Sequence, residues 1–385
     1  MTRIRVKLDA RRERSYTVEI LPGLLTMLPR RLARMMGGGR VFIITDTRVA
    51  RLYGRGLRRN LRTKGVDARL IAVAPGERSK NSSTVNRLHT RLLHGEIGRD
   101  STIVALGGGV VGDLAGYVAA TVLRGVRLIQ VPTTLLAQVD SSVGGKVGID
   151  HPAGKNLIGA FYQPTAVFID PLLLRTLPER EFRNGMAEVV KIAAALDRHF
   201  FDFIAARMPA IMRREPEILN SVIARSVRLK GHVVERDEYE AGLRKTLNLG
   251  HTFGHALEAS SGFRVKHGYA VAIGLASESA LAVRMGILRE AERVRLLSVL
   301  RAAGLPTRMP KRVVTKAFLD ALAMDKKNVG GETRFVLLTR IGSCATGAKV
   351  PTDLVRNSAL GKDIYRGEEG IRAPRGGTAG SASRP

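Results

Sequence analysis

Apolar and polar positions change their spacing along the chain, which divides it into an alternating first half, a helical second half and a polar end. In the first half, short apolar runs and two-residue alternations predict β-strands separated by helices. The predicted strands cover residues 3–7, 16–20, 40–45, 68–73, 102–106 and 126–131, and the predicted helices cover residues 50–63, 81–94 and 113–123. We expect edge strands at the start of the chain, and the alternation favours a mostly parallel, Rossmann-like α/β sheet with helices on both faces.

Beyond Pro178 the pattern changes to long amphipathic stretches, which predict a mainly α-helical domain. The predicted helices cover residues 179–207, 215–235, 243–260, 267–285, 288–303 and 313–324, and a late strand at residues 334–338 is expected to pack within this half. We place the boundary near residue 177, which gives an α/β domain over residues 1–177 and a helical metal- and substrate-binding domain over residues 178–365. Residues 366–385 lack apolar periodicity and are predicted to be a disordered tail.

Composition narrows the class of protein. The chain has 385 residues and is 44% hydrophobic, which is enough for two globular cores. No apolar run reaches the length of a membrane span, and no signal-type apolar segment follows the basic N-terminus, so a cytoplasmic location is expected. Cys344 is the only cysteine, which excludes an internal disulfide and a cysteine-based zinc cluster. Any metal must therefore use His and carboxylate ligands.

The net charge of +29 raises the alternative of a nucleic-acid-binding protein, because a basic surface attracts phosphate polyanions. However, aromatic residues make up only 5%, and the basic residues are spread along the whole chain. A solvated surface that favours small anionic substrates is the simpler account. Arg far outnumbers Lys, so positions that keep Lys indicate a need for a compact, titratable ammonium group. Such positions near the motifs below are Lys80, Lys146, Lys155, Lys191, Lys230, Lys326 and Lys327.

Residues 107–113 read Gly-Gly-Gly-Val-Val-Gly-Asp and match G-x-G-x-x-G between a predicted strand and a predicted helix. Glycines in this context let backbone N–H groups approach a pyrophosphate at the helix N-terminus. The acidic residue that usually ends the next strand is missing, so the dinucleotide site is non-standard and a ribose contact would have to come from the side of Asp46 and Glu77. Two alternatives stay open, because the turn could bind nothing and Asp113 could only cap its helix.

Histidines and one carboxylate nominate a metal site. His251 and His255 are four residues apart on a predicted helix, so both rings share one face and could chelate one cation. Glu188 interrupts an apolar stretch, and His267 begins the next predicted helix, so either could complete the site. The spacing does not say which histidine is spare, and histidines that only form hydrogen bonds remain the alternative.

Residues 138–148 form a polar, glycine-rich segment between predicted core elements, and we expect a functional loop there. Lys146 and the nearby Lys155 would supply two ammonium groups in one region, followed by Asn156. The alternative is an ordinary solvated loop.

Together, these segments resemble the 3-dehydroquinate synthase family of sugar phosphate cyclases over roughly residues 10–345. The resemblance is carried by residues 75–80, 107–113, 124–125, 132–146, 154–159, 187–191, 242–244, 248–255 and 267–268. It implies a phosphorus–oxygen lyase of the shikimate pathway that uses NAD and a divalent metal, zinc or cobalt. Its implied reaction converts 3-deoxy-D-arabino-heptulosonate 7-phosphate to 3-dehydroquinate and phosphate through transient oxidation, phosphate elimination, reduction, ring opening and an intramolecular aldol step.

The resemblance also implies roles for individual residues. Glu188, His251 and His267 would be the metal ligands, and a homodimer is implied in which Arg124 reaches the substrate phosphate of the neighbouring subunit. The implied substrate and catalytic positions are Arg124, Asp140, Lys146, Asn156, Lys191, Lys230, Arg244, Asn248 and His255. The implied or candidate NAD positions are Asp46, Pro75, Gly76, Glu77, Arg78, Ser79, Lys80, Gly109, Val110, Val111, Gly112, Asp113, Thr133, Thr134, Lys146, Lys155, Leu173, Leu174, Arg175 and Thr176. Neither a nucleic acid nor a membrane is expected as a partner.

Several residues depart from the family's usual pattern, namely Tyr269 after His-Gly, Asn184 in place of a common Ser, and Val122-Leu123 before Arg-Gly. None of them is a predicted metal ligand, so they bear on fine tuning more than on the reaction class. Two competing enzymes remain in view: another sugar phosphate cyclase acting on sedoheptulose 7-phosphate or glucose 6-phosphate, and a metal-dependent polyol dehydrogenase.

Overall fold

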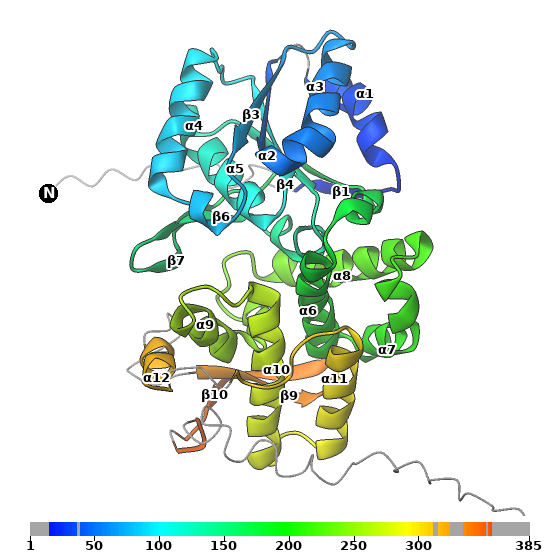
Figure 1. Cartoon of the computed structure of the whole chain (residues 1–385), viewed down its shortest axis with the longest axis vertical. Coiled ribbons are helices and arrows are strands. Elements are labelled where there is room, and N and C mark those ends of the chain that lie inside the picture. Colours follow the sequence, from blue (N-terminus) through cyan, green and yellow to red (C-terminus); the bar gives the residue numbers. More distant parts are fainter. Residues whose placement is uncertain (1–14, 37–38, 311–314, 324–333, 352, 356–385) are drawn as a thin grey trace, which may run out of the picture.

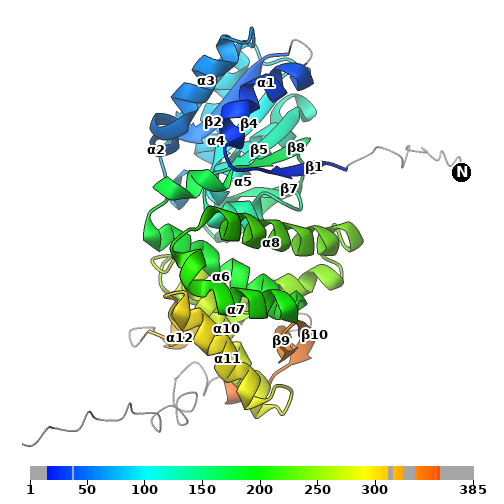
Figure 2. The same cartoon turned by 90° about the vertical axis from the view of Figure 1, so that its right-hand side faces the viewer.

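The computed structural model describes the chain except for residues 1–14, 37–38, 311–314, 324–333, 352 and 356–385. The predicted strand at residues 3–7, the predicted tail, Lys326 and Lys327 therefore lie outside the described residues. In two perpendicular views the α/β half lies at one end of the molecule and the helical half at the other (Figures 1 and 2). The predicted fold class, an α/β part followed by a mainly helical part, is confirmed.

The first half is built on a six-stranded sheet in the order β1-β8-β5-β4-β2-β3, in which every pairing is parallel. Its strands are β1 (Thr17–Ile20), β2 (Val41–Asp46), β3 (Ala68–Val73), β4 (Thr102–Gly107), β5 (Arg127–Pro132) and β8 (Ala166–Ile169). The expectation of edge strands at the start holds for β1 but is wrong for residues 40–45, because β2 pairs with β3 and β4. The continuous apolar run of β2 is buried from Val41 to Thr45, as expected for an inner parallel strand.

Helices cover both faces of the sheet because its inner strands carry apolar side chains on both sides. In β4, Ile103 and Ala105 pack in one cluster with α4 (Ser82–His94) and α5 (Gly109–Thr121). Val104 and Leu106 alternate to the other face and pack with α1 (Leu24–Met36) and α3 (Arg55–Arg62). The predicted helix at residues 50–63 is a π-helical turn (Ala50–Gly54) followed by α3, and the short helix α2 (Thr47–Val49) precedes it.

A β-hairpin projects from the α/β half where a loop was expected. β6 (Lys146–His151) pairs antiparallel with β7 (Gly154–Phe161), so the prediction of one loop over residues 138–148 is wrong at its C-terminal end. Gly148 lies opposite Gly159 in the hairpin, and a Cβ at Gly159 would come within 2.3 Å of the Val147 carbonyl oxygen. The glycines therefore permit close backbone pairing, while they conceal the strand pattern in the sequence.

The second half packs helices around a large apolar core to which α6, α7, α8, α9 and α10 all contribute. Its helices are α6 (Glu179–Leu196), α7 (Arg198–Met212), α8 (Pro216–Arg236), α9 (His251–Ser260), α10 (His267–Arg284), α11 (Glu290–Ala302) and α12 (Thr315–Ala323). The late strand is β9 (Arg334–Arg340), which pairs antiparallel with β10 (Ser343–Lys349). None of the helices in the described part of the chain is long and apolar enough to span a membrane.

Two predicted helices are interrupted for local reasons. Residues 179–207 divide at Asp197, whose side chain accepts a hydrogen bond from Phe200 N at 2.8 Å and caps α7. Residues 243–260 divide at Gly250, which has a left-handed φ of 78° and directly precedes α9. A Cβ at Gly250 would lie 2.8 Å from Leu275, so the turn requires glycine for its conformation and for its packing. Both breaks fix where the following helix begins.

Candidate active site

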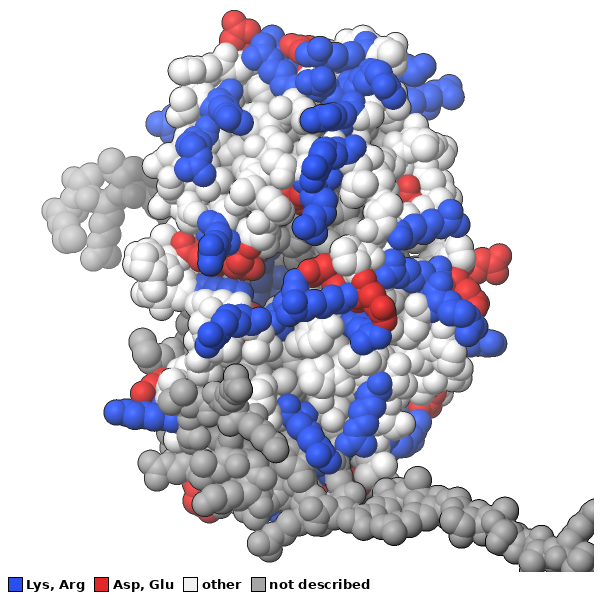
Figure 3. Space-filling view, viewed as in Figure 1, with Lys and Arg blue, Asp and Glu red and all other residues white. Residues whose placement is uncertain are grey.

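A cleft with a volume of about 1630 Å³ is lined by residues of both halves. Small-molecule sites commonly measure about 300–1,000 Å³, so this cleft has room for more than one ligand. It contains the N-terminus of α5, the hairpin, the turn after β3 and the first residues of α9 and α10. Figure 3 shows the molecule hollowed between its two halves, with Lys and Arg side chains at the hollow and scattered over the whole visible face.

The glycine turn at residues 107–113 forms one wall of the cleft. Helix α5 begins after Gly108, which provides no side-chain cap, and Gly108, Gly109 and Val111 line the cleft. Gly107 allows the tight turn, because a Cβ there would lie 2.6 Å from that of Val111. The wall therefore offers an uncapped helix N-terminus, which attracts anions through its free N–H groups and helix dipole.

Asp113 lies inside α5, so the alternative that it caps the helix is wrong. Its Oδ2 accepts a hydrogen bond from Lys80 Nζ at 2.6 Å, and Lys80 also donates to Asn156 Oδ1 in the hairpin. Lys80 is buried, and burial opposes its charge, but Asp113 and Glu77 raise the pKa of Lys80 above its ordinary value. Through these two hydrogen bonds, the charged Lys80 side chain connects the turn after β3 (residues 74–80) to α5 and to the hairpin.

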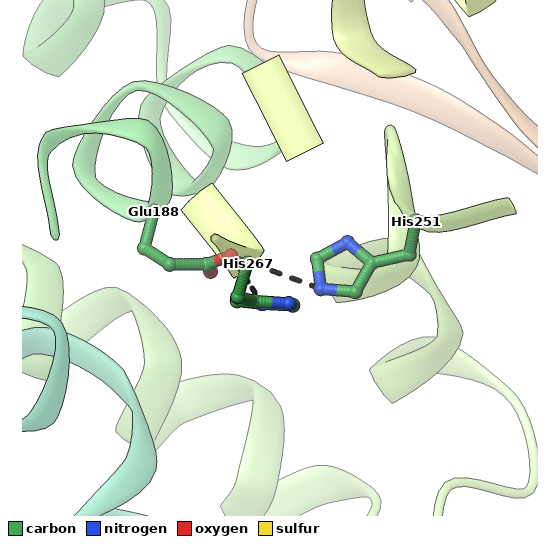
Figure 4. Close-up of side chains that lie close together, drawn as sticks. All are labelled: Glu188, His251 and His267. Atoms are coloured by element: carbon green, nitrogen blue, oxygen red, sulfur yellow. Dashed lines mark ion pairs between the residues drawn. The ribbon is translucent and has the colours of Figure 1, made fainter. Parts of the chain in front are cut away.

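A cluster of one carboxylate and two histidines, in which Glu188 and His251 are buried and His267 is half-buried, lies at the opposite wall (Figure 4). Glu188 Oε1, from the middle of α6, lies 3.7 Å from His251 Nε2 and 3.4 Å from His267 Nε2. Glu188 is fully buried, and within the described residues neither of its carboxylate oxygens has a hydrogen-bond partner, although Lys191 forms an ion pair with it. Two imidazoles and an unsatisfied carboxylate fit the ligand preferences of zinc and similar divalent metals.

A second cluster shares one of these histidines. His255, Glu258 and His267 also have ligand atoms within 4.8 Å of one another. His267 Nδ1 lies 3.0 Å from Glu258 Oε2, while Lys155 donates to the other oxygen of Glu258 at 3.1 Å. Burial works against the charge of His267, but Glu258 and Glu188 raise its pKa to about 10. Burial also opposes the charge of Glu258, but His267 and Lys155 lower the pKa of Glu258 to about 2.

Two residues that the sequence reasoning missed set the positions of the histidines. Glu278 of α10 is buried and accepts hydrogen bonds from Gly250 N at 2.7 Å and Phe253 N at 3.0 Å, so it caps the turn that carries His251. Asn184 of α6, noted above only as a departure, accepts a hydrogen bond from Gly268 N at 2.8 Å, beside His267. Glu278 carries the same signal that identified Glu188, a carboxylate within an apolar helix, but the role of Asn184 depends on a contact distant in the sequence.

Cations and their partners fill the floor of the cleft. Lys230 Nζ donates to Asp140 Oδ1 and to the Asp140 carbonyl oxygen, both at 2.6 Å. Burial opposes ionisation of Asp140, but Lys230 and Lys191 hold its pKa below the ordinary value. Arg244 donates to the Gly144 carbonyl oxygen at 2.9 Å, and Glu240 accepts hydrogen bonds from both Lys146 and Asn248.

Most of the predicted site residues line this one cleft. Glu188 lies behind its surface, next to His251 and His267. Besides Glu188, seven described residues with predicted roles are not among the lining residues, namely Arg78, Ser79, Gly112, Arg124, Leu173, Leu174 and Arg175. Ser79 donates to the Ala74 carbonyl oxygen at 2.7 Å, and a Cβ at Gly112 would lie 3.0 Å from Gln130, so both shape the wall from behind.

Comparison with known proteins finds family models and relatives that match most of the chain. A family model described as 3-dehydroquinate synthase N-terminal matches residues 70–184, and one described as 3-dehydroquinate synthase C-terminal matches residues 185–328. A curated 3-dehydroquinate synthase of Nostoc punctiforme (strain ATCC 29133 / PCC 73102) is 43% identical over 352 residues, which cover 91% of this chain and 97% of the relative.

Solved structures agree with the sequence comparison. The chain resembles 2-epi-5-epi-valiolone synthase from Streptomyces hygroscopicus subsp. jinggangensis 5008, solved with NAD+ and Zn2+ bound, with a TM-score of 0.85 at 29% identity over 92% of this chain and 99% of the other. It also resembles a 2-deoxy-scyllo-inosose synthase complexed with carbaglucose-6-phosphate, NAD+ and Co2+, with a TM-score of 0.83 at 26% identity over 89% and 96% of the two chains.

Proposed function

The chain belongs to the 3-dehydroquinate synthase family, and from that premise we infer that it is a phosphorus–oxygen lyase that uses NAD and a divalent metal. Its reaction converts 3-deoxy-D-arabino-heptulosonate 7-phosphate to 3-dehydroquinate and phosphate, as part of the shikimate pathway. One observation of geometry carries the proposal: the Glu188, His251 and His267 cluster opens on the same cleft as the glycine turn of α5. A metal and a dinucleotide can therefore serve one substrate. We also propose a cytoplasmic location.

Glu188, His251 and His267 are the proposed metal ligands. The fully buried carboxylate of Glu188 supports this choice, because its Oε2 pairs with Lys191 while its Oε1 has no hydrogen-bond partner among the described residues and faces Nε2 of both histidines. When bound, a divalent metal supplies Lewis acidity that makes a substrate hydroxyl easier to deprotonate. His255 is exposed and lines the cleft, which supports a role in contacting the substrate.

The N-terminus of α5 and the turn after β3 are the proposed NAD site. Gly109, Val110 and Val111 can present backbone N–H groups to the pyrophosphate, while Glu77 and Asp46 line the cleft on the ribose side. When bound here, NAD would supply reversible hydride chemistry, which is compatible with a reaction without net oxidation. Arg78, Leu173, Leu174 and Arg175 remain predictions for this site, because they do not line the cleft.

Residues at the floor of the cleft are proposed to hold the anionic groups of the substrate. Lys146, Lys191, Lys230 and Arg244 offer positive charge to its carboxylate and phosphate and to charge that develops during elimination. Asp140 keeps Lys230 in place through their hydrogen bond. Asn156 and Asn248, which line the same surface, can hydrogen-bond the neutral hydroxyl groups of the substrate.

Arg124 supports the proposal of a homodimer. Its side chain is exposed and lies outside the cleft of its own subunit. Leu123, Arg124 and Gly125 all have positive φ, at 50°, 63° and 119°, and non-glycine residues in this region carry a conformational cost. A turn held in this form is suited to present Arg124 to a neighbouring subunit's substrate phosphate.

Phosphate release separates this function from its alternatives. The purified protein is mixed with 3-deoxy-D-arabino-heptulosonate 7-phosphate, with and without NAD and a chelator, and inorganic phosphate is measured together with absorbance at the NADH wavelength. We expect phosphate release that requires NAD and metal, without NADH accumulation. Accumulating NADH would indicate a polyol dehydrogenase instead. Faster phosphate release from sedoheptulose 7-phosphate than from the keto acid would indicate another cyclase.

A further inference from the structure

Glu258 connects the two walls of the cleft. It lies on the same face of α9 as His251 and His255, because helix positions four and seven residues apart point in similar directions. Its side chain is buried, and its two oxygens have different partners. Oε2 lies 3.0 Å from His267 Nδ1, and Oε1 accepts a hydrogen bond from Lys155 Nζ at 3.1 Å.

The contact with His267 selects the tautomer of that ring. A neutral imidazole has one N–H donor and one acceptor nitrogen, and a carboxylate can only accept. When a cation takes the place of the Nε2 proton, Nδ1 keeps the hydrogen that points to Glu258, 3.0 Å away, and the lone pair of Nε2, which lies 3.4 Å from Glu188 Oε1, is directed at the cation. Nε2 is then the nitrogen available to a cation beside Glu188 and His251, as in carboxylate–histidine–metal arrangements.

The contact with Lys155 reaches the other half of the molecule. Lys155 lies on β7 of the hairpin, and its Nζ is 3.7 Å from Glu77 Oε2 in the turn after β3. The same ammonium group lies 4.8 Å from the centre of the Phe263 ring, which follows α9. A chain of contacts therefore connects the proposed dinucleotide turn to the proposed metal cluster, through Glu77, Lys155, Glu258 and His267.

We propose that Glu258 is the positioning residue of this site, which holds Nε2 of His267 toward the metal and couples metal binding to NAD binding through Lys155. The proposal rests on the proposed function for the identity of the two ligands. Glu258 differs from Glu188 in a way that supports this role. Both oxygens of Glu258 have partners in the described structure, whereas Oε2 of Glu188 pairs with Lys191 and Oε1 has no hydrogen-bond partner there.

Metal titration of the purified protein tests the proposal without any turnover. Co2+ binding is followed by its visible absorption, and Zn2+ affinity by competition with a chromophoric chelator, each with and without saturating NAD. The variants are Glu258→Gln, Lys155→Met and, as a matched control, Glu181→Gln. Glu181 pairs with Lys266, the residue next to His267, and removing its charge leaves the histidine ring contact unchanged.

We expect Glu258→Gln to weaken metal binding about 10- to 100-fold and to leave the shape of the Co2+ spectrum unchanged, since the ligand set is retained. NAD should tighten metal binding about 5-fold or more in the parent protein and have little effect in Glu258→Gln and Lys155→Met, since the linkage is reciprocal. Lys155→Met alters a more exposed side chain and provides a second test if Glu258→Gln does not fold, which thermal unfolding followed by circular dichroism reveals.

Three outcomes would overturn the proposal. A Co2+ spectrum that changes its coordination signature in Glu258→Gln would make Glu258 a ligand and not a positioning residue. Equal metal affinity in Glu258→Gln and Glu181→Gln would remove the role altogether. A parent protein whose metal affinity does not respond to NAD would remove the coupling. Failure of the proposed function is a separate observation, namely the lack of phosphate release from the keto acid.

Discussion

The two walls of the cleft offer different groups to a ligand, backbone groups on one wall and side chains on the other. The α/β wall presents backbone N–H groups at the start of α5, and its glycines keep side chains out of the way. The helical wall presents side chains, with the buried Glu188 and Lys191 on α6, the buried His251 at the start of α9 and the half-buried His267 at the start of α10. A backbone site tolerates changes of side chain as long as space remains, whereas a buried charged site depends on each member. Substitutions should therefore have unequal effects on the two walls.

The difference extends to the residues behind each wall. Behind the helical wall, glycines allow helix backbones to touch. A Cβ at Gly274 would lie 1.9 Å from the Gly250 carbonyl oxygen, and a Cβ at Gly268 would lie 1.9 Å from the Asn184 carbonyl oxygen. On the α/β wall, a Cβ at Gly109 would lie 3.1 Å from Ser141 Oγ, the nearest atom, which is a side-chain atom. Small shifts can relieve the second contact but not the first.

The largest effect is expected from loss of a metal ligand. His267→Ala removes a ring that lies 3.4 Å from Glu188 and should abolish metal binding and phosphate release together. His255→Ala is the matched control, because it removes the neighbouring exposed ring and should retain the metal. Metal content by atomic absorption and phosphate release are measured on both. Equal metal loss in the two variants would mean that the second cluster, with His255 and Glu258, holds the ion.

A pair of glycine substitutions should produce the next largest effect. Gly274→Ala forces α9 and α10 apart, which should destabilise the protein by at least about 1–3 kcal/mol and weaken metal binding. Gly109→Ala should leave the melting temperature nearly unchanged but weaken NAD binding, because the added methyl group lies where the backbone meets the pyrophosphate. Thermal unfolding and NAD titration by calorimetry measure both variants. A stable Gly274→Ala protein with normal metal affinity would contradict the proposed difference between the walls.

Local features of the fold could be predicted from the sequence, whereas contacts between distant segments could not. The parallel strands were predictable because Val41, Phe42 and Ile43 belong to an uninterrupted apolar run, although such a run does not give the strand's place in the sheet. The hairpin was missed because Gly148 and Gly159 face each other and leave no apolar alternation to detect. Local patterns thus predicted elements, while pairing between distant segments decided their neighbours.

The metal cluster was predictable as a set of candidates. Glu188 stood out as a charge in an apolar helix, and His251 and His255 by their spacing. The spacing could not show that His267 lies beside Glu188, because that contact depends on the packing of α10 against α6. Glu258 could have been found, since it continues the face of α9 that carries both histidines.

Lys146 offers a third test, because it belongs to the hairpin but pairs with Glu240 of the helical half. Lys146→Arg keeps the charge but replaces a compact ammonium group by a planar guanidinium group. We expect phosphate release to fall about 100-fold, with metal binding unchanged, because a cation that stabilises developing charge must be placed accurately. Steady-state phosphate release and Co2+ titration measure the two quantities. A nearly normal rate would show that positive charge alone is sufficient at this position.

The smallest effect concerns stability and its dependence on pH. Lys230 and Lys191 hold the pKa of Asp140 below its ordinary value despite burial, so the ionised Asp140 stabilises the folded state above that ordinary value, near 3.8. This contribution is lost as the pH falls through the lower pKa of the folded protein. Asp140→Asn leaves the buried Lys230 ammonium without its anionic partner and should cost about 1–3 kcal/mol at pH 7. Chemical unfolding of both proteins between pH 7 and acidic pH measures the difference, which should shrink on acidification. A difference that is independent of pH would assign the loss to packing and would show that the Asp140–Lys230 pair, which joins the two halves, contributes little to stability through its charges.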